Sequence, residues 1–129
     1  GLIDKKKERQ LAVDSIKRFL IKTPDETYPV SSMSGGNRQK VAISRWVVNN
    51  TELLIVCSPT RGVDVGAKYE IYGILEELKN QGKGIILISD EMPELIGMSD
   101  RIYCMRNGMI SGELDRSEVT EELLAFRMV

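Results

Sequence analysis

The stretch Ser32-Met33-Ser34-Gly35-Gly36-Asn37-Arg38-Gln39-Lys40-Val41 places a serine and two glycines directly before an amphipathic helical run. A helix N-terminus carries unpaired backbone N–H groups and a partial positive charge, so it suits a phosphate. Gly35 and Gly36 lack the Cβ atoms that would hold an anion away from the backbone, and the Ser34 hydroxyl adds a donor. In the alternative interpretation Ser34 is only an N-cap, with Asn37 a poor substitute for the Glu or Gln of a capping box. That alternative does not explain the glycines, because each weakens a first helical turn by about 1 kcal/mol relative to alanine.

The composition favours a globular chain and excludes several kinds of chemistry. With 129 residues, 42% of them apolar, the chain is long enough for a domain with a core. A net charge of −1 gives no reason to expect nucleic acid as a partner. The absence of histidine argues against zinc sites and histidine-based catalysis, and the two cysteines are too few for a disulfide framework.

The pattern of apolar residues predicts alternating helices and strands, which favours an α/β sheet. Helices are expected over 4–21, 35–49, 65–79 and 92–98, with a loop over 22–32. The continuous apolar runs 53–56 and 85–88 are typical of strands buried on both faces. Asn107-Gly108 predicts a hairpin between 101–105 and 109–114, and Ser117 is expected to cap a last helix.

The quoted stretch closely resembles the signature motif of ATP-binding cassettes, the nucleotide-binding subunits of ABC transporters. Asn37 in place of the more usual glutamine, followed by Arg-Gln-Lys-Val, is similar to the branch that imports simple sugars such as ribose or galactose. The resemblance covers essentially the whole chain and extends to the second cassette of a two-cassette subunit. It also rests on Gly1-Leu2-Ile3, Lys5-Lys6-Lys7-Glu8, Ile21-Lys22-Thr23-Pro24, the run from Pro59 to Lys68, and Glu91-Met92-Pro93-Glu94-Leu95.

This resemblance implies the C-terminal part of a RecA-like P-loop NTPase core, with a mostly parallel sheet and a C-terminal hairpin. Residues 1–32 would be the end of the helical subdomain, and 33–129 the signature helix and the second half of the core. No Gly-x-x-x-x-Gly-Lys-Ser/Thr is present, and the resemblance places this Walker A loop and the glutamine loop upstream of residue 1. We therefore expect an incomplete sheet with an uncovered apolar face, and self-association of the chain.

The resemblance puts Cys57 and Ser58 at the positions of the Walker B carboxylates, and Asp90 at the position of the switch histidine. A neutral thiol is a poor Mg²⁺ ligand, serine is not a base near pH 7, and a carboxylate repels phosphate. We therefore expect no intact catalytic residue and no metal site at these positions, with Cys57 a small buried hydrophobe. The alternatives are a nucleophilic Cys57, which lacks an activating base, and an acid/base pair of Asp90 and Glu91.

Three further sets of residues have two interpretations each. Asp64 matches the D-loop aspartate, which in the family contacts the opposite cassette, and it also suits an N-cap. Arg38 and Lys40 would either screen phosphate charge or, as we favour, be solvated. Trp46 is expected in the core rather than on a stacking surface.

The resemblance implies that Ser34, Gly35, Gly36 and Asn37 contact a nucleotide held by a second cassette, in the same chain or in a dimer mate. ATP and Mg²⁺ would serve the complete assembly, and neither is expected on the isolated chain. The complete protein would be a transport-coupled ATPase at the cytoplasmic, inner face of the cell membrane. It would act with permease subunits and, indirectly, a sugar-binding protein. A non-transport cassette and a catalytically dead regulatory cassette remain as alternatives.

Overall fold

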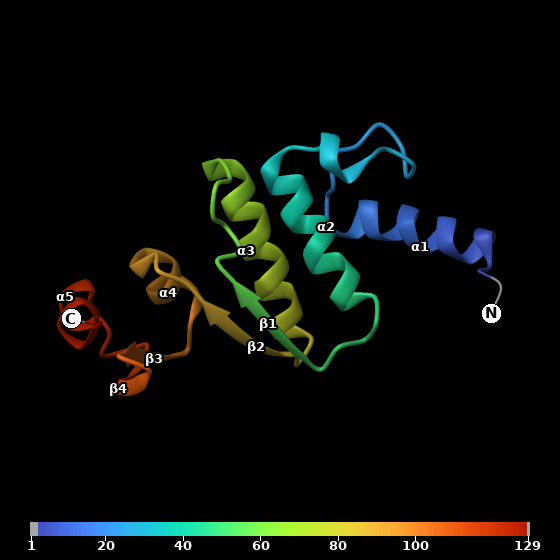
Figure 1. Cartoon of the computed structure of the whole chain (residues 1–129). Helices are drawn as coiled ribbons and strands as arrows, with labels where there is room; N and C mark the ends of the chain where they lie inside the picture. The colour runs from blue at the N-terminus through green and yellow to red at the C-terminus, as the bar shows by residue number, and fades with distance from the viewer. Residues whose placement is uncertain (1–2, 129) are drawn as a thin grey trace. The chain divides into compact units, whose positions relative to one another are not determined.

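The computed structural model describes residues 3–128, so Gly1, Leu2 and Val129 lie outside the described residues. Helices and strands alternate along most of the chain, as the sequence predicts (Figure 1). The chain forms two compact units. The first runs up to Ile55 and from Pro59 to Ile86, and the second contains Val56–Ser58 and Leu87–Val129. The predicted division between residues 32 and 33 stays a prediction.

The first unit begins with α1, Lys5–Arg18, whose N-cap Asp4 accepts hydrogen bonds from the amides of the first turn. The predicted helix ends earlier than expected, because Leu20 adopts a positive φ of 50° that no right-handed helix can continue. The predicted loop that follows contains a short 3₁₀ helix, Val30–Ser32. The helix α2 then spans Gly35–Val47.

Two parallel strands flank the next helix. β1 is Leu53–Cys57, α3 is Val65–Asn80 and β2 is Gly84–Ile88. Gly84 N donates to Glu52 O at 2.9 Å and Ser58 N donates to Ile88 O at 2.7 Å, so the strands pair in the same direction. The apolar core of the first unit comes mainly from α2 and α3 (Ile43, Val47, Ile71, Ile74, Leu75 and Leu78).

β1 is buried on one face only, which corrects the prediction of two buried faces. Leu54 and Val56 are buried, whereas Leu53 and Ile55 are 51% and 61% exposed. Ile86 of β2 is 47% exposed. The sheet of two strands thus leaves apolar side chains uncovered, as expected from the resemblance.

The second unit contains α4, Met92–Met98, the hairpin strands β3, Arg101–Arg106, and β4, Met109–Asp115, and α5, Glu121–Met128. Asn107 and Gly108 both have positive φ, which the predicted two-residue hairpin turn requires. The antiparallel register pairs Arg106 with Met109 and carries a bulge after Cys104. The core of this unit gathers one face of the hairpin and the two helices (Leu95, Ile102, Cys104, Leu114 and Leu124).

Two residues do not take the roles that the sequence predicts for them. Trp46 is 63% exposed, because α2 turns the stripe of Ile43, Ser44 and Val47 inward and leaves Trp46 beside it. Ser117 does not cap the last helix. Thr120 does so, since its hydroxyl oxygen accepts a hydrogen bond from Leu123 N at 3.2 Å.

At its two glycines, the first turn of α2 lies close to α3 and to the loop that precedes α3. A Cβ on Gly36 would lie 2.4 Å from Ala67 Cβ, and one on Gly35 would lie 3.2 Å from the Gly62 carbonyl oxygen. Both glycines therefore have a packing reason, which the sequence alone did not reveal.

We predict that Gly36→Ala lowers the free energy of unfolding by about 1–3 kcal/mol, because the added methyl forces α2 and α3 apart. Gly73→Ala is the control, since nothing lies within 4 Å of its added Cβ on the same α3. It should stabilise the chain by up to about 1 kcal/mol through helix propensity. Urea denaturation measures both, and an equal effect of the two substitutions would contradict the packing argument.

Candidate functional site

Ser34 is the N-cap of α2, so the capping interpretation is confirmed. Its backbone is extended, with φ −61° and ψ 159°, and its side chain accepts a hydrogen bond from Asn37 N at 3.4 Å. Asn37 Nδ2 donates to the same oxygen at 2.9 Å. A serine hydroxyl also has a proton to donate, and Ser34 is exposed, so this proton faces solvent or a ligand.

Asn37 does not form a capping box, but it connects α2 to the end of the α1 region. Its Oδ1 accepts a hydrogen bond from Lys22 N at 2.8 Å, while its Nδ2 holds the Ser34 hydroxyl. The side chain is nearly buried. Asparagine suits this place because a single amide both accepts and donates.

Lys40 is 1% exposed, so the prediction of a solvated lysine is wrong, although Arg38 is exposed as expected. Lys40 Nζ donates to Glu70 Oε2 at 2.8 Å and to the Leu20 carbonyl oxygen. The spacing of Lys40 from Ser44 and Val47 is the signal that places it on the buried stripe of α2.

The Glu70 carboxylate sits between two ammonium groups. Lys22 Nζ donates to its Oε1 at 3.3 Å, opposite the bond from Lys40. The hydrogen bond from Lys40 contributes most, and that from Lys22 adds to it, so the pKa of Glu70 lies below its usual value of 4.5 although partial burial opposes this. This ion pair was not predicted from the sequence.

Asp64 is the N-cap of α3. Its Oδ1 accepts a hydrogen bond from Ala67 N at 2.9 Å, and the side chain is exposed. The capping interpretation is therefore confirmed, and the D-loop role stays a prediction.

The second unit brings together the strand ends that carry Cys57, Ser58 and Asp90. Cys57 is exposed, which corrects the prediction of a buried side chain, because it continues the exposed face of β1. Ser58 has a positive φ of 46° and donates its N–H to Ile88 O, two residues before the exposed Asp90. A thiol and a hydroxyl do not fit Mg²⁺, which prefers carboxylate oxygens, so the end of β1 does not suit a metal-assisted step.

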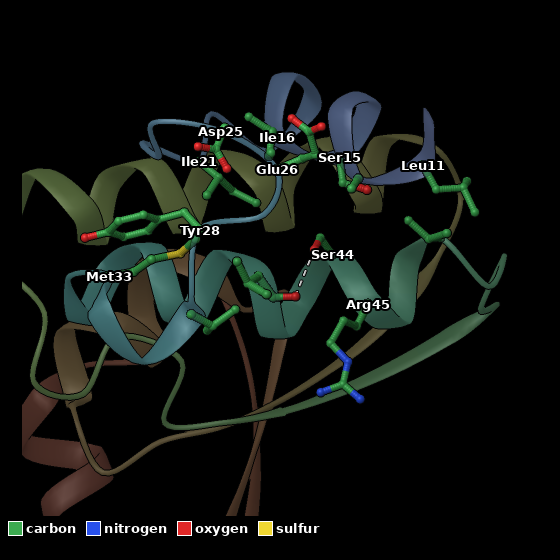
Figure 2. Close-up of a pocket in the computed structure, with 14 residues that line it drawn as sticks. Leu11, Ser15, Ile16, Ile21, Asp25, Glu26, Tyr28, Met33, Ser44 and Arg45 are labelled. Atoms are coloured by element: carbon green, nitrogen blue, oxygen red, sulfur yellow. Dashed lines mark hydrogen bonds between the residues drawn. The ribbon is translucent and has the colours of Figure 1, made fainter. Parts of the chain in front are cut away.

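An apolar groove of about 370 Å³ lies in the first unit between α1, α2 and the segment that connects them (Figure 2). Leu11, Ser15 and Ile16 enter it from α1, and Ser44 and Arg45 come from α2. The two carboxylates of the connecting segment are engaged: Asp25 accepts hydrogen bonds from Thr27, and Glu26 pairs with Arg9. The groove therefore offers a largely apolar surface and no catalytic constellation.

Residues 3–128 contain neither a cluster of metal ligands nor a membrane-spanning helix. No three His, Cys, Asp or Glu side chains in this range are grouped to hold a metal ion. No helix within the same range has the length and apolar character needed to cross a membrane.

Known proteins resemble this chain strongly. It is 52% identical over 122 residues to a xylose import ATP-binding protein of Geobacillus kaustophilus, and 48% identical over 122 residues to a ribose import ATP-binding protein of Yersinia pestis. Each match covers 95% of this chain and 24% of the relative, so the chain spans about a quarter of their length. In sequence the chain is thus similar to part of these import ATP-binding proteins, in keeping with the resemblance to ATP-binding cassettes.

Solved structures agree on the fold. A dimeric structure of a bacterial ABC transporter cassette superposes with a TM-score of 0.77 at 22% identity, over 90% of this chain and 50% of the other. No protein-family model matches the chain. The α/β architecture that the alternating apolar runs predict is thus that of an ATP-binding cassette. The role of Ser34 to Asn37 toward a nucleotide stays a prediction.

We predict that Glu70 contributes stability that is lost in acid. Its pKa is lower in the folded chain than in the unfolded chain, so the contribution is complete above about pH 4.5 and falls as pH drops through the folded value. Glu70→Gln should flatten this part of the profile of unfolding free energy against pH. Glu76→Gln, at an exposed carboxylate of the same helix, is the control. Parallel acid profiles for the wild type and Glu70→Gln would contradict the assignment.

Proposed function

We propose that this chain is the signature-bearing part of the ATP-binding subunit of a sugar importer. The observation that carries the proposal is the exposed Ser34 at the start of α2, in a chain about 50% identical to xylose and ribose import ATP-binding proteins. The complete protein would hydrolyse ATP and couple this to carbohydrate uptake through membrane permease subunits, with a sugar-binding protein as an indirect partner. It would work at the cytoplasmic face of the membrane.

In this proposal Ser34 acts on a nucleotide that a second cassette holds. The first N–H groups of a helix have no carbonyl partner within the helix, and they carry the positive end of its dipole. The Ser34 hydroxyl and the amides at the start of α2 would together donate hydrogen bonds to a phosphate group of ATP. Gly35 lets this turn lie close to the Gly62 carbonyl oxygen, and Gly36 lets it lie against Ala67. Asp64, at the start of α3, would contact the opposite cassette.

The chain's own half-site would be degenerate. Cys57 and Ser58 stand where the family places the carboxylate that holds Mg²⁺ and the one that polarises the attacking water. Asp90 stands in place of the histidine that meets the γ-phosphate and would repel it. The isolated chain would therefore neither bind ATP tightly nor hydrolyse it. A catalytically dead regulatory cassette is the second candidate, and these same three residues favour it.

We predict that Ser34→Ala lowers the ATPase and transport rates of an importer assembled with the complete ATP-binding subunit by about 10- to 100-fold. A hydrogen bond to a charged phosphate contributes about 1.5–3 kcal/mol, which corresponds to that factor. Ser58→Ala should change both rates little, because Ser58 is not a competent base. Sugar uptake and phosphate release measured in proteoliposomes give the comparison.

Thr120→Ala is the control for the loss of a hydroxyl cap, since it also removes a side-chain oxygen from a helix start. It should lower stability without lowering the catalytic rate. Severe and equal losses for Ser34→Ala and Ser58→Ala would show that the proposed division of labour is wrong.

We also predict that the isolated chain self-associates through the uncovered face of β1 and β2. Leu53, Ile55 and Ile86 are exposed apolar side chains in strand positions, which recruit a second chain. Ile55→Thr should weaken association, whereas Ile110→Thr, at an exposed isoleucine of the hairpin, should not. Light scattering after size exclusion measures the mass. A monomer of 14.5 kDa at high micromolar concentration would contradict this prediction.

A further inference from the structure

Lys40 is the point at which three segments of the first unit meet. It rises from the second turn of α2, and its Nζ reaches the Glu70 carboxylate on α3 and the Leu20 carbonyl just beyond α1. An ammonium group taken out of water is costly unless charged and polar partners surround it. The burial of Lys40 therefore fixes the position of its partners as well as its own.

A second set of contacts joins the same segments nearer to Ser34. Lys22 follows Leu20 by two residues, and its backbone N–H donates to Asn37 Oδ1 at 2.8 Å, while its Nζ donates to Glu70 Oε1. Asn37 in turn holds the Ser34 hydroxyl oxygen at 2.9 Å. A continuous chain of hydrogen bonds thus runs from the Glu70 carboxylate through Lys22 and Asn37 to Ser34.

We propose that Lys40 is a positioning residue, whose ammonium fixes α2 against α3 and the end of α1 and so sets the aim of the Ser34 hydroxyl at the phosphate. This inference rests on the proposed function of Ser34. Lys40 lies on the buried side of α2 and acts on the nucleotide only through the placement of this helix.

The left-handed backbone conformation of Leu20 is a further part of this arrangement. A positive φ is strained for leucine and persists only where the surroundings hold it. The Leu20 carbonyl accepts from Lys40, and the next residues lead directly to the Lys22 amide that binds Asn37. Loss of the Lys40 ammonium removes the donor to the Leu20 carbonyl and leaves Glu70 paired with Lys22 alone. The contacts that hold α2 to α3 and to the end of α1 therefore loosen.

The test uses the importer assembled with the complete ATP-binding subunit and compares Lys40→Met with the wild type. Methionine keeps the length and apolar stem of the side chain and removes the charge. We expect kcat for ATP hydrolysis to fall about 10- to 100-fold, because a displacement of about 1 Å at a reacting group has this effect. KM for ATP should stay within about threefold, since the second cassette holds the nucleotide.

Two variants accompany it. Lys40→Arg keeps a cation that can reach both acceptors and should restore much of the rate. Lys17→Met makes the same change at an exposed lysine in the last turn of α1 and should leave kcat and KM unchanged. An unchanged kcat in Lys40→Met, or a raised KM with kcat intact, would overturn the inference.

Ser34→Ala separates this inference from the proposed function. If Lys40 acts through Ser34, the double variant Ser34→Ala with Lys40→Met should be no slower than Ser34→Ala alone. Full activity of Ser34→Ala would refute the proposed function itself. A severe defect in Ser34→Ala with normal rates in Lys40→Met would refute only the role of Lys40.

Urea denaturation of the subunit shows whether Lys40→Met folds. If it does not fold, Glu70→Gln provides the test instead. The amide retains one acceptor oxygen for a lysine and loses the charge. It should lower kcat in the same direction as Lys40→Met, by a smaller factor, with KM maintained. A normal kcat for a folded Glu70→Gln subunit, with no defect in any folded Lys40 variant, would contradict the inference.

Discussion

The contact between the first turn of α2 and the first turn of α3 is the constraint on which this structure depends most. A Cβ at Gly36 would lie 2.4 Å from that of Ala67, so the two helices approach this closely only because residue 36 is glycine. The approach brings Lys40 within reach of Glu70. The two glycines thus have a packing role, while the Ser34 cap of the same turn stays exposed.

Local signals predicted the fold well where they were strong. Asn107-Gly108 adopts the positive φ values that its turn requires, and Met92–Met98 has the predicted bounds. The failures arose where two residues competed for one role or one face. Thr120 lies closer than Ser117 to the first residue of α5, so it provides the cap. The apolar character of Trp46 favours the core, but the orientation of α2 follows from its contact with α3.

The helix cap at Ser34 was predictable from the sequence, but the contacts around it were not. The cap at Ser34 follows from neighbours in the sequence, and its exposure from its place at the helix start. The bonds of Lys40 to Leu20 and Glu70 join residues 20 and 30 positions apart, which no local pattern encodes. The exposure of Cys57 escaped prediction for a related reason: whether a continuous apolar strand is covered on its second face depends on what else packs there.

The two cysteines differ in exposure, so their rates of chemical modification can report on the second unit. Cys57 is exposed at the end of β1, whereas Cys104 is buried with Leu95, Ile102, Leu114 and Leu124. A thiol reagent meets Cys57 in the native chain but reaches Cys104 only when the core around the hairpin opens. The modification rate of Cys104 therefore reports the local opening of this core, and Cys57 serves as its internal reference for intrinsic reactivity.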